Sequence, residues 1–332
     1  MDKNLQTSTI QKLIFLLVNN DNEFLSGQKL SAELGVSRTA VWKHIEELRK
    51  EGYDIEAVAR KGYKLLSIPD AITAKEILNN LSTNIFGKDI FFYQVVTSTQ
   101  KIATEMAMSG AAEGTVIVAE EQTEGRGRLQ RKWHTPSGNS VAMSIIIRPR
   151  ILLSSTPHFT LLVAVSIVKA IKDISTLNPK IKWPNDILIN GKKSVGILTE
   201  LNAEADQINF LIVGIGINVN QVIDDLPKEI QNIATSLAIE DGKKFRRAEL
   251  IRSILTNLEY FYEKYIKEGF TSIKDIWEKE SCTIGENIIA KTSLETIEGR
   301  AVGITNDGIL LLEDKEGNIH NIISGDIFID TK

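Results

Sequence analysis

Apolar and polar positions near the start of the chain recur with the period of a helix. Residues 10, 13, 14, 17 and 18 are apolar, which is the i, i+3, i+4, i+7, i+8 spacing of a helix buried along one face. A second short helix is predicted to end at Gly35, and Ser37 is predicted to cap a third. Tyr53–Val58 and Gly62–Leu66 follow as a predicted hairpin. Helices joined by a tight turn and followed by a hairpin indicate a winged helix-turn-helix in residues 1–66.

Basic residues gather in the third predicted helix and in the hairpin. In this motif the third helix enters the major groove of DNA and the hairpin touches the backbone, so these side chains are candidates for base and phosphate contacts. The whole chain has a net charge of −4, and a small protein-interaction module with ordinary surface charges is the alternative interpretation. The predicted DNA-binding residues are Ser37, Arg38, Thr39, Lys43, Arg49, Lys50, Arg60 and Lys61, with Lys64 in the same hairpin.

Helical and β-type patterns are mixed between residues 67 and 280. Leu161–Ile174 is predicted to be an almost fully buried helix, and Ala248–Ile266 an amphipathic one. Tight turns between strand candidates, such as Asn190-Gly191, favour a mixed or antiparallel sheet. The predicted strands are Thr115–Ala119, Val141–Ile147, Asp186–Ile189, Val195–Leu201 and Phe210–Asn218.

Short β-type segments separated by turn signals make up residues 281–332. Asn306-Asp307-Gly308 and Glu316-Gly317-Asn318 are typical of tight turns. A small SH3-like β-barrel is predicted here, so the chain is expected to be an α+β protein with domains at residues 1–66, 67–280 and 281–332. The predicted strands are Asn287–Lys291, Gly299–Ile304, Ile309–Leu312 and Asn318–Ile323.

Composition narrows the class of protein. Apolar residues make up 42% and charged residues 25% of the chain, as in ordinary soluble globular proteins. Cys282 is the single cysteine, so no internal disulfide can form and a reducing, cytoplasmic location is expected. The start of the chain has no apolar signal core, and apolar stretches such as Leu161–Val165 are far shorter than the ~20 residues that span a bilayer. No membrane association is expected.

The segment Glu121–Trp133 concentrates positive charge beside glycines. Glycine lets a backbone approach a ligand closely, and arginine supplies planar donors for carboxylate or phosphate oxygens. We predict a loop that becomes ordered around a polyanion, and a solvated basic loop or a nucleic-acid patch is the alternative. The residues concerned are Gly125, Arg126, Gly127, Arg128, Arg131 and Lys132.

The segment Lys182–Asp186, Lys-Trp-Pro-Asn-Asp, is predicted to end a strand in a tight turn. Lys182 next to a packed Trp183 can act as a fixed positive charge that neutralises charge developing at a phosphorus centre. The alternative is a hairpin turn with an incidental lysine.

Three glycines fall inside predicted strands, namely Gly196, Gly214 and Gly216. Glycine within a strand often marks the close approach of a ligand to the backbone. Tight packing of the sheet against other elements is the alternative interpretation.

These segments together resemble the bifunctional biotin–protein ligases that also repress the biotin operon. The combination of Gly-Arg-Gly-Arg, a trailing Lys-Trp and a later Lys-Trp-Pro-Asn-Asp is specific, whereas each motif alone is weak. The resemblance covers essentially the whole chain. The matching positions are Ser98-Thr99-Gln100, Gln122, Gly125–Arg128, Lys132-Trp133, Lys182–Asp186, Val195–Glu200 and Gly216–Asn218.

The resemblance implies a two-step reaction. Biotin attacks the α-phosphate of ATP to give biotinyl-5′-adenylate, and a lysine of a biotin carboxyl carrier protein, from acetyl-CoA carboxylase or another biotin-dependent carboxylase, then takes the biotin. Because two anions must meet, cations and Mg²⁺ are expected at the site. The family also implies that the adenylate favours a homodimer, which binds an inverted-repeat operator DNA as a biotin-responsive repressor.

The resemblance also implies roles for individual residues. Lys182 and Arg128 would be catalytic, and no side chain is expected to bind a metal. Gln130 stands where many family members have glycine, which would stiffen the loop. The residues expected at biotin are Ser98, Thr99, Gln100, Gln122, Gly125, Arg126, Gly127, Arg128, Lys182 and Gly196. Those expected at ATP and the adenylate are Arg128, Arg131, Trp133, Lys182 and Asn218.

Two other functions compete with this interpretation. A lipoate–protein ligase shares the fold and the adenylation chemistry, but the paired motifs argue against it. A transcription factor that only senses a ligand, without ligase activity, would have no need to keep Arg128 and Lys182.

Overall fold

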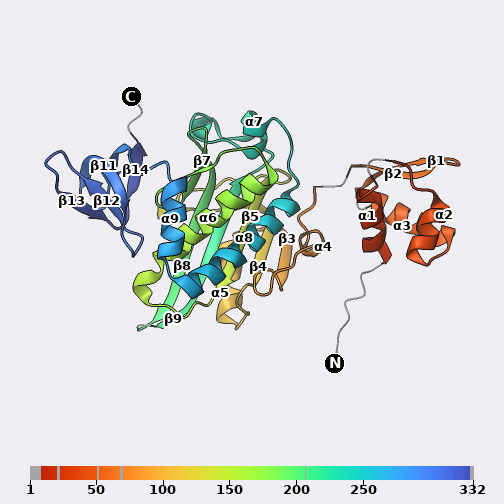
Figure 1. Cartoon of the computed structure of the whole chain (residues 1–332), viewed down its shortest axis with the longest axis horizontal. Helices are drawn as coiled ribbons and strands as arrows, with labels where there is room; N and C mark the ends of the chain where they lie inside the picture. The colour runs from red at the N-terminus through yellow and green to blue at the C-terminus, as the bar shows by residue number, and fades with distance from the viewer. Residues whose placement is uncertain (1–8, 21–22, 51, 68–69, 206, 330–332) are drawn as a thin grey trace. The chain divides into compact units, whose positions relative to one another are not determined.

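The structure is a computed structural model of the chain that describes residues 9–20, 23–50, 52–67, 70–205 and 207–329. Contacts divide the chain into two compact units, Met1–Asp70 and Ala71–Lys332. Figure 1 shows both units, with labels on most of their helices and strands.

The first unit confirms the predicted winged helix-turn-helix. Gly35, with φ 65°, ends the second helix in the left-handed conformation, and the Ser37 hydroxyl accepts a 3.2 Å bond from the Ala40 amide at the start of the third. Leu25 also bridges to Tyr63, which ties the hairpin to the segment before the second helix. The elements are α1 (Thr9–Val18), α2 (Gly27–Leu34), α3 (Arg38–Lys50), β1 (Asp54–Val58) and β2 (Gly62–Ser67).

The second unit is built on a seven-stranded sheet with the order β3-β4-β5-β9-β8-β7-β6. Strands β3 and β4 are parallel, and each of the other neighbouring pairs is antiparallel, so the predicted mixed sheet is confirmed. The sequence pattern missed β3 and gave no range for β6, the strand expected to end at Lys182. The strands are β3 (Ile90–Val96), β4 (Val116–Gln122), β5 (Ser140–Ile147), β6 (Lys180–Lys182), β7 (Asp186–Ile189), β8 (Lys192–Glu204) and β9 (Gln207–Asn218).

Helices cover both faces of this sheet. Alternate residues of a strand face opposite sides, so Val213 and Ile215 of β9 join a core with α6 and α8, whereas Ile212 packs with Ala103 of α5 on the other face. The stretch Leu153–Ile174 is long and apolar enough to cross a bilayer, but 67% of its most apolar window is buried inside the fold, as expected of a core helix. The helices are α4 (Ala74–Leu78), α5 (Thr99–Met108), α6 (Pro157–Ile174), α7 (Leu237–Asp241), α8 (Arg247–Glu268) and α9 (Thr271–Glu280).

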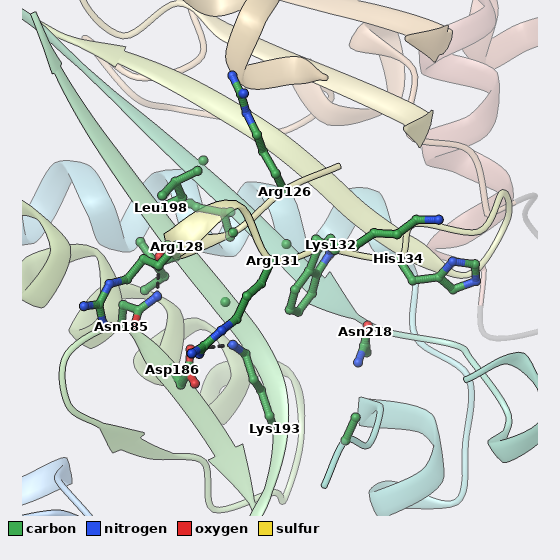
Figure 2. Close-up of a pocket in the computed structure, with 18 of the residues that line it drawn as sticks. Arg126, Arg128, Arg131, Lys132, His134, Asn185, Asp186, Lys193, Leu198 and Asn218 are labelled. Carbon is green, nitrogen blue, oxygen red and sulfur yellow. Dashed lines mark hydrogen bonds and ion pairs between the residues drawn. The ribbon is translucent and has the colours of Figure 1, made fainter. Parts of the chain in front are cut away.

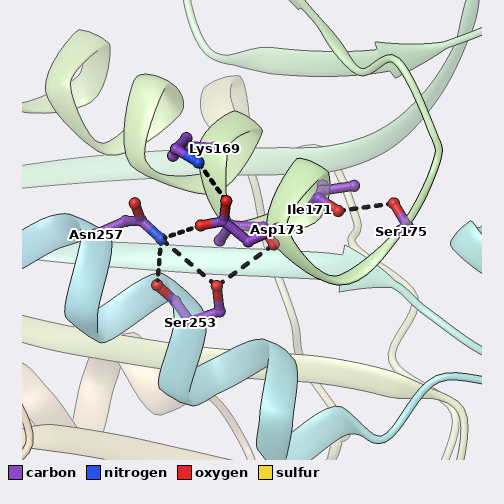
Figure 3. Close-up of polar contacts among 7 residues, drawn as sticks. Lys169, Ile171, Asp173, Ser175, Ser253 and Asn257 are labelled. Atoms are coloured by element: carbon purple, nitrogen blue, oxygen red, sulfur yellow. Dashed lines mark hydrogen bonds and ion pairs between the residues drawn. The ribbon is translucent and has the colours of Figure 1, made fainter.

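Polar side chains join α6 to α8 at the surface (Figure 3). Asp173 near the end of α6 accepts a 3.0 Å hydrogen bond from the Asn257 amide of α8 and pairs with Lys169 one turn earlier. The same Asn257 amide donates to the Ser253 carbonyl at 2.9 Å. These contacts join the two helices that cover the face of the sheet opposite α5.

The C-terminal part is a five-stranded antiparallel sheet with the order β13-β12-β11-β10-β14. It shares its apolar core with α6 and α9. His158 of α6 stacks on Phe270 with ring centroids 3.9 Å apart, and its Nε2 lies 2.8 Å from the Asn306 carbonyl in a loop of this sheet. The predicted α+β class is therefore confirmed. The strands are β10 (Asn287–Lys291), β11 (Thr296–Ile304), β12 (Leu310–Glu313), β13 (Ile319–Ile322) and β14 (Asp326–Ile329), the last of which the pattern missed.

Candidate functional site

Small residues on three neighbouring strands form the floor of a cavity of about 780 Å³. Ser144 of β5 pairs with Gly214 of β9, and Gly196 of β8 pairs with Gly216 of β9. These positions alternate with residues of the core between the sheet and α6, so they face the α5 side. The strand glycines therefore mark a hollow on this face of the sheet.

Hydrogen bonds at the start of α5 form one end of the cavity. The Gln122 side-chain oxygen accepts bonds from the Thr99 amide at 2.8 Å and the Thr99 hydroxyl at 3.1 Å. The Ser144 hydroxyl lies 2.9 Å from Thr99 Oγ1 and 3.0 Å from Gln100 Oε1. Ser98 precedes the helix without a side-chain capping bond, so its hydroxyl stays available at the cavity. This end can bind a polar ring by several directed hydrogen bonds.

Gln100 shapes the floor rather than only lining it. Its Nε2 donates to the Ile212 carbonyl at 3.0 Å, and a Cβ on Gly214 would lie 2.5 Å from its Oε1. A larger residue at position 214 would therefore clash with the Gln100 side chain where it now lies. The pattern of glycines predicted a close approach at this strand, and here the approaching group is a side chain of the chain itself.

The Trp133 indole lies across the other floor glycines. A Cβ on Gly216 would stand 2.4 Å from Trp133 Nε1, and one on Gly196 would stand 3.0 Å from its Cζ3. The Lys193 ammonium lies 5.5 Å from the centroid of the Trp133 ring. Gly196, predicted to contact biotin, thus makes room for Trp133, although it also lines the cavity.

The basic loop is a tight hairpin-like turn above this floor. The Gly127 amide donates to the Arg131 carbonyl and the Trp133 amide to the Gly125 carbonyl, each at 2.8 Å. Gly125, predicted to line the biotin site, is buried and is not among the cavity residues. A Cβ there would lie 2.6 Å from the Trp133 carbonyl, so its role is to close the loop.

Gln130 adopts a conformation that favours glycine. Its φ is 60° and that of Leu129 is 54°, both in the left-handed region. Its side-chain oxygen accepts a 3.3 Å bond from Arg126. Gln130, expected to stiffen the loop, is therefore accommodated at the cost of backbone strain. Figure 2 shows Arg126 directed away from Arg131.

Arg128 and Arg131 reach the C-terminal sheet. Arg128 donates to Asn185 Oδ1 at 3.2 Å and to Ser324 Oγ at 3.0 Å, and Arg131 Nη1 donates to Asp326 at 3.0 Å. Burial lowers the pKa of the Arg128 guanidinium, and the charges of Asp326 and Asp186 oppose that shift. The hydrogen bond from Arg131 lowers the pKa of the Asp326 carboxyl. These carboxylates balance part of the positive charge of the two arginines at this side of the cavity.

Lys182 enters the cavity from the end of β6, where the strand turns into β7. Its neighbour Trp183 is held by two bonds, since its amide donates to Thr283 Oγ1 at 3.0 Å and its indole to the Gly308 carbonyl at 3.3 Å. Lys193 pairs with Asp186 at 2.6 Å. The anchored turn thus places Lys182 at the same cavity as Arg128 and Arg131, where the family resemblance, and not the spacing alone, had put it.

An apolar wall lies at the other end and was missed from the sequence. It comes from the segment after β9, whose residues show no regular helical or β-type spacing, so no sequence signal marked it. Asn218, expected at the adenylate, lines the cavity, but its amide donates to the Thr235 carbonyl at 2.9 Å and its oxygen accepts from Gln221 at 3.1 Å. Asn218 therefore also fixes this segment. The wall consists of Leu226, Pro227, Ile230, Ile233 and Ala234.

The cavity brings together most of the predicted ligand contacts. It also includes Lys132 of the predicted basic loop, and it includes His134, Asp186, Lys193 and Asp326, which were not predicted as contacts. Within the described ranges no three His, Cys, Asp or Glu side chains converge on a metal site. The predicted residues that line it are Ser98, Thr99, Gln100, Gln122, Arg126, Gly127, Arg128, Arg131, Trp133, Lys182, Gly196 and Asn218.

In the first unit, α3 presents the residues predicted to bind DNA. Ser37, Arg38, Thr39 and Lys43 are exposed at its start. Arg49 is different, because its Nε donates to the Ile55 carbonyl at 3.0 Å and its Nη1 to Glu46 at 2.8 Å. Arg49 therefore joins α3 to the hairpin. The remaining predicted contacts, Lys50, Arg60 and Lys61, are also exposed.

Comparison with known proteins follows the same order of parts. Family models match as the HTH domain over residues 9–64, the Biotin/lipoate A/B protein ligase family over 92–218 and the Biotin protein ligase C terminal domain over 283–330. The bifunctional ligase/repressor BirA of Bacillus subtilis is 52% identical over 96% of this chain and 98% of its own length. That of Escherichia coli is 30% identical over 95% of each chain.

A solved structure shares the fold of the second unit. A biotin protein ligase from Aquifex aeolicus in complex with biotin and ATP aligns with a TM-score of 0.64 and 32% identity, covering 74% of this chain and 100% of its own. The fold and the cavity thus define a protein ligase of the biotin and lipoate class that also carries an N-terminal helix-turn-helix domain. The chain belongs to the family of bifunctional biotin–protein ligases and repressors. The predicted enzyme class and repressor function are confirmed at the level of this family, and the two competing functions lose their support.

Proposed function

We propose that the cavity binds biotin and ATP together, and that the chain joins biotin first to AMP and then to a lysine of a carrier protein. The observation that carries the proposal is the convergence of the basic loop and Lys182, from separate segments, on one cavity with a hydrogen-bonding end and an apolar end. The Aquifex relative, whose structure is in complex with biotin and ATP, supports the same pair of substrates.

Each end of the cavity suits one substrate. The polar biotin ring would bind at Ser98, Thr99 and Gln122, with its acid chain over the floor toward Lys182. The adenine would lie against the apolar wall at Leu226 and Ile230, with Trp133 on its other side. The α-phosphate would then meet the carboxylate between Lys182 and the basic loop, where opposite charge is available.

The first step joins two anions. A carboxylate oxygen of biotin forms a bond to the α-phosphorus, the bond from that phosphorus to the bridging oxygen breaks, and pyrophosphate leaves with the electron pair. Lys182 and Arg128 stabilise the negative charge on the phosphorus oxygens in the transition state. Because Trp183 is anchored at Thr283 and Gly308, the Lys182 charge is held in place before the substrates arrive.

The second step uses the mixed anhydride as an acylating agent. The carrier lysine nitrogen attacks the biotinyl carbon, the bond to the phosphate oxygen breaks, and AMP leaves while the amine gives up a proton. We propose that Arg128 and Arg131 retain the adenylate until the carrier arrives. This requires them to exchange Ser324 and Asp326 for phosphate oxygens.

Mg²⁺ enters this proposal as part of the substrate MgATP. Asp186 and Asp326 are the carboxylates at the cavity, and each is already paired, with Lys193 and Arg131. Mg²⁺ commonly binds through substrate phosphates and few carboxylates. The residues present therefore fit an ion carried by the ATP phosphates, which would offset their charge.

The remaining assignments are proposals of the same kind. We propose that the protein acts in the cytoplasm, that its domains are residues 1–66, 67–280 and 281–332, and that its carriers are the biotin-dependent carboxylases. The adenylate would favour a homodimer with two DNA-binding heads, which suits an inverted-repeat operator. The exposed start of α3 supports the DNA contact.

The ligase proposal is tested by incubating the full chain with biotin, ATP, Mg²⁺ and a biotin carboxyl carrier domain. A mass gain of one biotinyl group on the carrier, dependent on ATP, is the expected result. The matched control replaces biotin by lipoate at the same concentration. Labelling with lipoate but not with biotin, or labelling without ATP, would contradict the proposal.

A further inference from the structure

Trp42 on α3 is half exposed, at 52% of its surface, in a protein whose Trp183 and Trp277 are almost fully buried. Large exposed aromatic side chains are common at binding surfaces, where the partner covers them when the complex forms. No hydrogen bond or ring contact joins Trp42 to another residue that the structure describes. The described part of this unit therefore leaves about half of the indole uncovered and its N–H without a partner.

The position of Trp42 is set by the opposite face of the helix. Val41, Ile45 and Leu48 are fully buried in the core of the first unit, which fixes the rotation of α3 about its axis. Trp42 lies one turn after Arg38 and Thr39, which are both exposed, and beside exposed Lys43. An apolar ring thus stands among cations and a hydroxyl within the first turns of the helix.

The cations and the hydroxyl around Trp42 argue for DNA as its binding partner. Residues in the first turns of a recognition helix face base edges in the major groove, where cations to either side bind phosphates. The C5-methyl group of thymine is the apolar feature that the major groove offers. An indole ring cannot neutralise a phosphate, but it can cover that methyl group and offer its N–H to a nearby base acceptor.

Phe15 provides an internal comparison. It is exposed at 59% on α1, in the same unit, and has one exposed cation, Lys12, one turn before it. Unlike Trp42, however, it does not lie on the helix that follows the tight turn of the motif. Exposure alone therefore does not single out Trp42. The neighbouring Arg38, Thr39 and Lys43 do.

We propose that Trp42 is a specificity-determining residue that reads a thymine methyl group in each half of the operator. The proposal rests on the operator binding proposed above. It predicts a contact that contributes to sequence preference but releases no counterions. Lys43, by contrast, would bind phosphate and contribute to all duplexes.

The test is a binding titration of the full-length Trp42→Ala and Trp42→Phe proteins, in the presence of biotin and ATP. Trp42→Ala should weaken operator binding by at least about 10-fold and leave binding to random duplex unchanged. Its slope of log affinity against log salt should equal that of the unaltered protein, whereas Lys43→Ala should lower the slope by about 0.9 per head. Trp42→Phe keeps a ring and should recover part of the loss, and Phe15→Ala is the matched control that should bind normally.

A second series replaces each operator thymine by uracil, which lacks only the methyl group. The unaltered protein should lose affinity at one position in each half-site, and Trp42→Ala should be insensitive there. Equal losses on operator and random duplex, or equal uracil sensitivity in both proteins, would overturn the role of Trp42 while operator binding stands. If the unaltered protein does not prefer operator to random duplex, the repressor proposal itself fails, and the role of Trp42 fails with it.

Discussion

Replacing Gly216 by alanine tests whether the floor of the cavity is built around Trp133. The added Cβ would stand 2.4 Å from both Nε1 and Cε2 of the indole and 2.9 Å from Cζ2. Since ordinary contacts begin near 3.4 Å, the ring must retreat by about 1 Å. The ring also lies over Gly196, and its backbone is bonded to Gly125, so the loop has little room to adjust.

Overpacking of this kind destabilises by about 1–3 kcal/mol, and we expect Gly216→Ala to lose that much free energy of unfolding. Displacement of Trp133 and the loop should also slow adenylate formation. Urea unfolding and ATP–pyrophosphate exchange with biotin measure the two effects. Gly127→Ala is the matched control for stability, because its Cβ would meet no atom closer than 3.8 Å.

A double-mutant cycle isolates the contact. In a Trp133→Ala background the clash is absent, so Gly216→Ala should then change stability by less than about 0.5 kcal/mol. An equal loss in both backgrounds would show that the glycine serves the sheet rather than the indole. Unchanged stability in the single variant would refute the packing argument altogether.

The other predictions concern charge. Lys182→Ala should keep biotin binding but slow single-turnover adenylate synthesis by about 10²–10³, because it removes a preorganised cation, and near-normal synthesis would disprove its role. Arg128→Gly should release adenylate that labels bystander lysines, which mass spectrometry of a mixed-protein reaction would detect; labelling confined to the carrier would argue against retention by Arg128. Burial lowers the pKa of His158 below its ordinary 6.5, so the unfolded chain binds a proton that the folded chain resists. Stability should therefore fall as the pH drops below about 6.5, and His158→Asn should flatten this dependence in urea titrations at several pH values; an unchanged slope would exclude His158 as its source.

The spacing of apolar residues along the chain was sufficient to predict the helices and strands in which buried positions recur regularly. The helical period at α1 and α3, the cap at Ser37 and the turn glycine Gly35 are properties of neighbouring residues, so they could be predicted without the fold. The same holds for the buried helix α6. The residue types of the basic loop and of the Lys182 turn allowed an anion site but did not decide it. Only their combination, through the family resemblance, indicated the ligase chemistry.

Tertiary structure decided what each of these residues contacts. Gly196 and Gly216 accommodate Trp133, and Gly125 closes a loop, because sheet register and loop path bring segments together that no local pattern relates. Arg131 donates a hydrogen bond to Asp326, which lies 195 residues later in the sequence. The apolar wall after β9 comes from a segment of irregular backbone. Spacing encodes which face of an element is buried, whereas the partner on that face depends on how all the elements pack at once.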